Sequence, residues 1–160
     1  MPPAFTKSFA ARLNQNSALT VMEARDGERI LPGHAYVAPG SHHLEVSRSQ
    51  QGFVCRLNDG ALVSGHRPSV DILFHSIAKH VGPKAMGIIL TGMGRDGADG
   101  LLAMRQAGAT TIGQNQASCV VYGMPRAANE IGAVAAELSV DEIARELSNE
   151  KPSDRAVCRR

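Results

Sequence analysis

Apolar and polar residues alternate along this chain with two different periods, and the second half shows the pattern most clearly. Residues 85–91 form a continuous apolar run, which is typical of a strand covered on both faces. Residues 109–114 and 133–138 predict two further strands. The segments that predict helices run from Pro68 to Val81, through Leu101 to Gly108, from Pro125 to Ile131, and onward from Ser139 with a capping box to Glu142. Because strands alternate with helices, the pattern predicts an α/β domain with a doubly wound, mostly parallel sheet and helices on both faces.

The first half of the chain predicts shorter elements. Phe5, Phe9 and Leu13 recur at four-residue intervals, which predicts a helix with one apolar stripe. The segments that predict strands are 19–22 and 35–38, followed by a small antiparallel hairpin over 43–47 and 53–57. A doubly wound domain usually opens on a strand, whereas this chain opens on a helix. We therefore expect one domain over residues 1–150 that lacks its first strands, and a disordered tail over residues 151–160.

Composition narrows the functional classes. Hydrophobic residues make up 43% of the chain and charged residues 20%, with a net charge of +2, which is typical of a soluble globular domain and too weak to suggest nucleic-acid binding. The three cysteines form neither a disulfide framework nor a zinc motif, which favours a reducing, cytoplasmic compartment. The longest apolar run is too short to insert in a membrane. The six histidines lack the spacing of metal ligands, so we expect no metal.

One glycine-rich turn carries the candidate chemistry. Residues 92–97, Gly-Met-Gly-Arg-Asp-Gly, match the G-x-G-x-x-G pattern of a dinucleotide site between a strand and a helix. Two features oppose that interpretation: no acidic residue ends the next strand to bind a ribose, and Asp96 would repel a pyrophosphate. We therefore expect no cofactor. Asp96 either caps the following helix, which spacing alone favours, or orients a histidine in a Ser-His-Asp arrangement, with the Met93 N–H exposed at the end of the strand.

Two further segments are candidates for the same edge of the sheet. Residues 118–126 follow the next strand, and they could form a wall of a substrate cleft. Cys119 in this segment is expected to be a small buried residue, because no histidine or cation is predicted beside it to activate a nucleophile. Ser69 and Asp71 open the long helix, and we expect both to cap it, while Arg67 could reach an anionic or carbonyl-bearing partner.

With these segments in hand, the chain resembles the C-terminal catalytic domain of the chemotaxis protein-glutamate methylesterases, the CheB family. The segments that carry the resemblance occur in family order and are Met1–Ala10, Gly33–Gly40, His66–Asp71, Ile89–Ala98 and Ser118–Arg126. The resemblance implies a cytoplasmic serine hydrolase that removes methyl esters from glutamates on chemoreceptor cytoplasmic helices and often deamidates glutamines. It implies that Asp96 is the acid of a Ser-His-Asp triad and that the backbone N–H of Met93 helps to stabilise the oxyanion.

The chain also departs from the family pattern. In the family the nucleophilic serine follows the first strand and the histidine lies just before the Met-Pro with which this chain begins, so we expect neither residue here and little activity from this chain alone. We also expect no receiver domain, which commonly precedes the catalytic domain, within these 160 residues, and residues 61–65 differ from the family pattern. Two alternatives stay open: a non-catalytic relative that binds receptors, and a dinucleotide-binding module.

Overall fold

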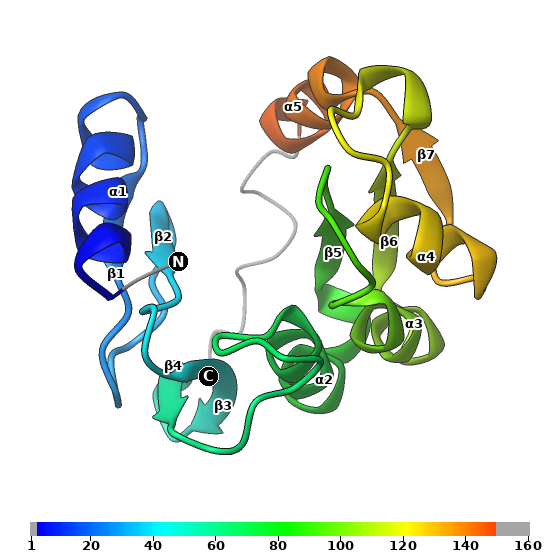
Figure 1. Ribbon diagram of the computed structural model, residues 1–160. Helices are drawn as coiled ribbons and strands as arrows, with labels where there is room; N and C mark the ends of the chain where they lie inside the picture. The colour runs from blue at the N-terminus through cyan, green and yellow to red at the C-terminus, as the bar shows by residue number, and fades with distance from the viewer. Residues whose placement is uncertain (1–2, 150–160) are drawn as a thin grey trace.

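The computed structural model describes residues 3–149, which fold into alternating helices and strands around a horseshoe-shaped path (Figure 1). The elements are α1 (Pro3–Gln15), β1 (Thr20–Glu23), β2 (His34–Val37), β3 (His43–Ser49), β4 (Gly52–Asn58), α2 (Val70–His80), η1 (Gly82–Lys84), β5 (Met86–Ile89), α3 (Ala98–Gln106), β6 (Thr110–Gln114), η2 (Gln116–Ser118), α4 (Met124–Glu130), β7 (Ala136–Leu138) and α5 (Val140–Asn149). The predicted α/β class is confirmed. The predicted tail lies outside the described residues.

The strands form three small sheets. β5, β6 and β7 pair in parallel in that order, β1 pairs with β2 in parallel, and β3 pairs with β4 as the antiparallel hairpin that the sequence predicts. The mostly parallel arrangement is thus confirmed. The parallel strands are divided between two sheets, and within residues 3–149 no ladder of hydrogen bonds joins those two sheets.

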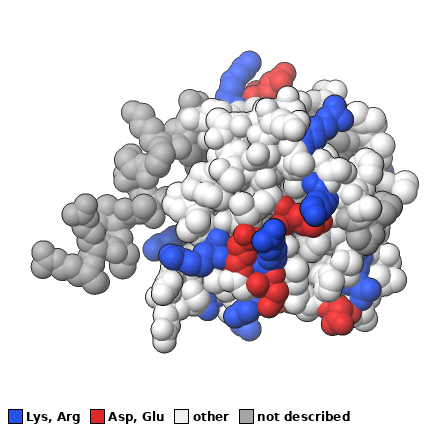
Figure 2. Space-filling view, turned by 90° about the vertical axis from the view of Figure 1, so that its left-hand side faces the viewer, with Lys and Arg blue, Asp and Glu red and all other residues white. Residues whose placement is uncertain are grey.

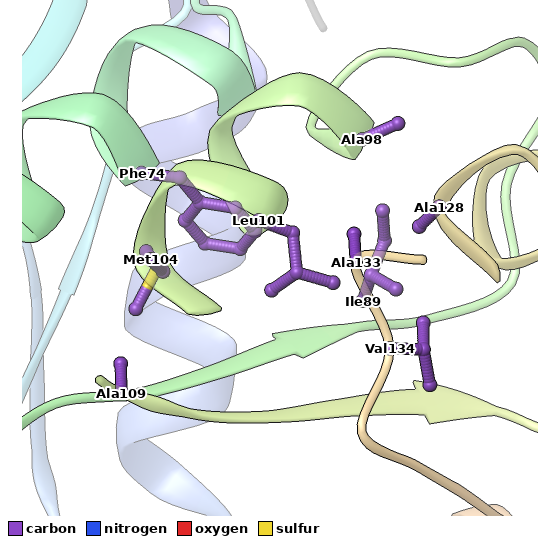
Figure 3. Packing of buried hydrophobic residues seen from close by; sticks show 9 residues of the cluster. All are labelled: Phe74, Ile89, Ala98, Leu101, Met104, Ala109, Ala128, Ala133 and Val134. Carbon is purple, nitrogen blue, oxygen red and sulfur yellow. The ribbon is translucent and has the colours of Figure 1, made fainter. Parts of the chain in front are cut away.

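The main core lies between α2, α3 and the β5–β6–β7 sheet (Figure 3). Ile89 of β5 and Leu101 and Met104 of α3 are almost fully buried there, with Phe74 of α2 beside them. Phe74 is the aromatic residue of this cluster, and the rest is aliphatic or methionine. This packing holds α3, and the turn that leads into it, against the ends of the strands.

The apolar stripe of α1 faces solvent. Phe5 is 57% exposed, and Phe9 and Leu13 are each 38% exposed. The side of α1 that packs against the parallel pair carries the small residues Thr6 and Ala10, which are 1% and 2% exposed. Small side chains let a helix approach a sheet closely, so close packing places the large residues of α1 outside. The helix was predicted correctly, whereas its apolar stripe is not its buried face.

The side of the molecule that carries α1 presents lysine, arginine, aspartate and glutamate mixed together (Figure 2). A depression of about 580 Å³ lies between α1 and β1, and its charged lining residues are Lys7, Glu23, Arg25 and Glu28. Because both signs of charge alternate, this side produces no strong field of one sign. None of the described helices has the length and apolar composition needed to cross a membrane.

Candidate functional site

The glycine turn and the segment after β6 lie side by side at the carboxyl ends of two neighbouring parallel strands. Thr91 and Val121 are joined twice: the Thr91 Oγ1 hydroxyl donates to the Val121 carbonyl at 3.1 Å and accepts from the Val121 N–H at 2.9 Å. The Gly92 N–H also donates to the Val121 carbonyl at 3.1 Å, and the Met124 N–H donates to the Gly92 carbonyl at 2.8 Å. Ligands of parallel sheets bind at this edge, so the two segments define the candidate site.

The two segments approach so closely that glycine is required at the contact. A Cβ atom at Gly92 would lie 2.3 Å from Met124 Sδ, and one at Gly123 would lie 2.6 Å from the Gly92 carbonyl oxygen. A larger residue at Gly123 would meet backbone and push the segments apart, whereas the Met124 side chain beside Gly92 can move. The glycines therefore serve the packing of two loops, a role different from the approach to a pyrophosphate that the G-x-G-x-x-G pattern suggests.

The Gln114 side chain joins the two segments at the same edge of the sheet. Its side chain is buried at the end of β6, where Oε1 accepts from the Thr91 N–H at 2.8 Å and Nε2 donates to the Ser118 carbonyl at 2.8 Å. An amide side chain can donate and accept at once, which lets it join two loops. Gln114 occupies the place where a dinucleotide fold would have an acidic residue for the ribose, and here it has a structural partner on each side.

An open groove of about 570 Å³ runs between the two segments, and its lining residues are Met93, Gly94, Arg95, Val121, Tyr122, Gly123, Arg126 and Ala127. The Met93 side chain is 85% exposed at its mouth. The backbone N–H of Met93 donates to no acceptor within the described part of the chain. The local hydrogen bonds of the turn therefore do not use this backbone donor.

Asp96 directly follows Arg95, a lining residue of this groove, and the first turn of α2 holds its carboxylate. Oδ1 accepts from the Ser69 hydroxyl at 2.6 Å and from the Asp71 N–H at 3.3 Å, and Oδ2 accepts from the Val70 N–H at 2.8 Å. The residue is 7% exposed. The prediction that Asp96 caps the following helix names the wrong helix. α3 begins after Gly97, whose φ of 91° only glycine adopts readily, with no side-chain cap, and Asp96 instead accepts from the N–H groups that open α2.

A matching contact runs in the opposite direction between the same two helices. The carboxylate of Asp71, in the first turn of α2, accepts from the Gly100 N–H of α3 at 2.7 Å. Asp71 thus caps α3 and not its own helix, and Ser69, although it occupies the N-cap position of α2, makes no side-chain cap there. At each helix N-terminus, backbone N–H groups donate to an aspartate carboxylate from the other segment. This is possible because the two helices pack with their N-termini side by side.

Each of the six histidines lies within the described residues, and none of them contacts the Asp96 carboxylate. His43 is the buried one: its Nδ1 accepts from the Ser69 N–H at 3.1 Å and its Nε2 lies 3.0 Å from the Ala61 carbonyl. His34 and His42 have partners in their own loops, and His66 and His75 are exposed. No group of three or more metal-ligating side chains occurs among residues 3–149.

The sequence analysis gave Tyr122 no role of its own, and it expected Cys119 to be a small buried residue. The hydroxyl of Tyr122 donates to Glu137 at 2.6 Å, and this hydrogen bond raises the pKa of Tyr122. Cys119 is half-buried, with its thiol 3.8 Å from the Gln114 carbonyl. The signal that could have found Tyr122 is its place after β6, at the same edge as the glycine turn.

Comparison with known proteins places the chain in a family. The model of the CheB methylesterase family matches residues 1–147, so the chain belongs to the CheB methylesterase family. It is 56% identical over 147 residues to proteins of Salmonella typhimurium strain LT2 and Escherichia coli strain K12 named protein-glutamate methylesterase/protein-glutamine glutaminase, and the match covers 92% of this chain and 42% of each relative. The chain therefore spans less than half the length of these curated relatives.

The fold agrees with a solved structure of the family. The crystal structure of the Thermotoga maritima CheB methylesterase catalytic domain superposes with a TM-score of 0.89 at 39% sequence identity, covering 92% of this chain and 78% of that one. The resemblance that the sequence motifs indicated is confirmed. The roles of Asp96 and Met93 are a separate matter and follow as a proposal.

Proposed function

We propose that this chain supplies the acid and one oxyanion donor of a cytoplasmic chemotaxis protein-glutamate methylesterase. The observation that carries the proposal is the Asp96 carboxylate, which is buried, held by three donors and next in sequence to a residue that lines an open groove at the carboxyl edge of a parallel sheet. A dinucleotide site has no comparable support, because Asp96 and Gln114 occupy the positions where a pyrophosphate and a ribose would need different groups.

The proposed reaction is hydrolysis of a glutamate methyl ester on a chemoreceptor helix. A serine hydroxyl attacks the ester carbonyl while a histidine takes its proton, and the histidine then protonates the departing methoxide to release methanol. Water attacks the acyl-enzyme in the same way and frees the glutamate. Deamidation of a glutamine follows the same steps with ammonia as the leaving group.

Asp96 would orient that histidine and stabilise its charged form. Each carboxylate oxygen can accept two hydrogen bonds, and Oδ2 accepts one within the described residues, from the Val70 N–H. Oδ2 can therefore accept a second hydrogen bond, from an imidazole N–H. The free N–H of Met93 would donate to the oxyanion that forms on the ester carbonyl. Because none of the chain's own histidines reaches Asp96, we propose that the serine and the histidine come from outside these 160 residues.

The test is methanol release from methylated receptor membranes by the full-length gene product and its Asp96→Ala variant. We expect kcat to fall by about 10⁴-fold, because the imidazole loses its orienting acid. Asp141→Ala is the control, since Asp141 is an exposed aspartate at the start of α5, away from the groove. An Asp96→Ala variant that stays folded and keeps full activity would contradict the proposal. Reading the coding DNA upstream of Met1 for a glycine-flanked serine and a histidine tests the origin of the other two residues.

A further inference from the structure

A chain of hydrogen bonds reaches Asp96 from the β3–β4 hairpin. It runs from the Ala61 carbonyl through the His43 ring to the Ser69 backbone N–H, and from the Ser69 hydroxyl to Asp96. His43 is 1% exposed and Ser69 is 3% exposed. The His43 ring nitrogens, the Ser69 N–H and the Ser69 hydroxyl each have a hydrogen-bond partner in this network. Buried polar groups need such partners to be held in one arrangement.

The Ser69 hydroxyl makes the shortest of the three contacts to Asp96. The O···O distance is 2.6 Å, within the range of hydrogen bonds between a hydroxyl and a carboxylate. A hydroxyl has one proton to donate. Because Ser69 gives that proton to Asp96, and because its side chain makes no cap of its own helix, its side-chain hydrogen bond is committed to the orientation of this carboxylate.

The backbone of Ser69 is fixed as well. Its N–H donates to Nδ1 of His43, so Nδ1 is unprotonated and Nε2 carries the proton that goes to the Ala61 carbonyl; this tautomer is assigned from the two partners. His43 belongs to β3, and Ser69 precedes α2. The hairpin thus fixes the backbone of Ser69, the residue whose hydroxyl donates to Asp96.

We propose that Ser69 is a positioning residue for the proposed acid Asp96: its hydroxyl fixes the rotation of the carboxylate, so that Oδ2 is presented to the histidine in one orientation. This inference rests on the proposed function. It assigns Ser69 no contact with substrate. Ser69 affects kcat through Asp96, so the effect of replacing Ser69 should disappear when Asp96 is replaced.

The experiment measures kcat and KM for methanol release by the full-length gene product. The variants are Ser69→Ala, Asp96→Ala and the double variant, which together form a double-mutant cycle. Ser76→Ala is the matched control: Ser76 lies on the same helix, is 6% exposed, and bonds to Val46 and Leu73 without contact to Asp96. Ser69→Thr tests rescue by a retained hydroxyl. Thermal unfolding verifies that each protein is folded at the assay temperature, and Ser69→Gly takes the place of Ser69→Ala if that variant is not folded.

We expect Ser69→Ala to lower kcat by about 10-fold with KM unchanged, since one charge-assisted hydrogen bond is lost. Ser69→Thr should recover most of kcat, and Ser76→Ala should keep it even where it lowers the melting temperature. Adding Ser69→Ala to Asp96→Ala should change kcat by less than about 2-fold. An equal loss in both backgrounds would show that Ser69 acts through the fold, which overturns the inference.

The two proposals fail in different ways. If Asp96→Ala lowers kcat and Ser69→Ala does not, the inference about Ser69 is wrong and the proposed function stands. If Asp96→Ala keeps full kcat, the proposed role of Asp96 is wrong, and Ser69 has no acid to position.

Discussion

Single residues in this chain take their properties from neighbours that are distant in sequence, and Cys55 is a clear case. The thiol is 1% exposed, and burial together with the charge of Glu28 raises its pKa from 9.0 to about 11. A thiol reacts as the thiolate. At pH 8 about one molecule in a thousand would carry the thiolate at Cys55, and the site would also be closed to reagent.

We therefore predict that iodoacetamide at pH 8 alkylates Cys119 long before Cys55 in the folded protein. Cys158 is replaced by serine so that two thiols are compared, and mass spectrometry of peptides follows each one. Cys119 is only half-buried, and the comparison is internal to one sample. Raising the pH toward 11 should speed the labelling of Cys55, because its thiolate then forms. Equal rates at pH 8 would contradict the burial of Cys55.

Asp96 shows how far sequence reasoning reaches at this scale. The turn marked it as a candidate, and the family motifs assigned it a role. Capping of the next helix was the local interpretation, and it was wrong because the nearest free donors belong to α2, about 25 residues earlier in the chain. Which donors a carboxylate meets depends on how two helices pack, and no local spacing encodes that.

At the scale of elements, the crossed contact between α2 and α3 depends on Gly100. A Cβ atom there would lie 2.9 Å from the Asp71 carbonyl oxygen and 2.7 Å from the Phe74 Cβ. In an open helix position, glycine to alanine stabilises a protein by about 1 kcal/mol. Here the new methyl group would meet the backbone of α2, which cannot move aside without separating the helices.

We predict that Gly100→Ala lowers the free energy of unfolding by about 1–3 kcal/mol, as overpacking does. Urea unfolding followed by circular dichroism measures it. Asp99→Ala, at the exposed neighbouring position, should stay within about 0.5 kcal/mol of the parent. The sign is decisive: a stabilised Gly100→Ala protein would show that the two helices are not in this close contact.

Elements whose signals are local were predicted well. The capping box before α5 is present: the Ser139 N–H donates to Glu142 at 2.7 Å, and the Glu142 N–H donates to the Ser139 hydroxyl at 3.3 Å. The hydroxyl and N–H of Ser139 lower the pKa of Glu142. The stabilisation of α5 by the ionised Glu142 carboxylate is therefore complete above its ordinary pKa of 4.5. It is lost as the pH falls through the lower pKa of Glu142 in the folded state. The buried face of α1 was not predictable, because it depends on the sheet beneath the helix.

At the scale of the whole molecule, no histidine among the described residues contacts the carboxylate of the proposed acid Asp96. We predict that the 160-residue polypeptide alone releases at most a trace of methanol from methylated receptor above the buffer blank. The full-length gene product, assayed at the same concentration, is the positive control. Removal of triad members leaves a small residual catalysis in serine hydrolases, so a trace above the blank is compatible with the prediction. A rate near that of the full-length protein would contradict it.

The sequence by itself determined the α/β class, most of the helices and strands, the family, and the turn that carries Asp96 and Met93. These features depend on residue periodicity and on motifs a few residues long, which are local properties. The tertiary structure alone decided that the parallel strands fall in two sheets, that α1 buries its small residues, and that Ser69 and the start of α2 hold Asp96. Each of these depends on the approach of segments that are far apart in the chain, where close packing and the pairing of buried polar groups decide the outcome.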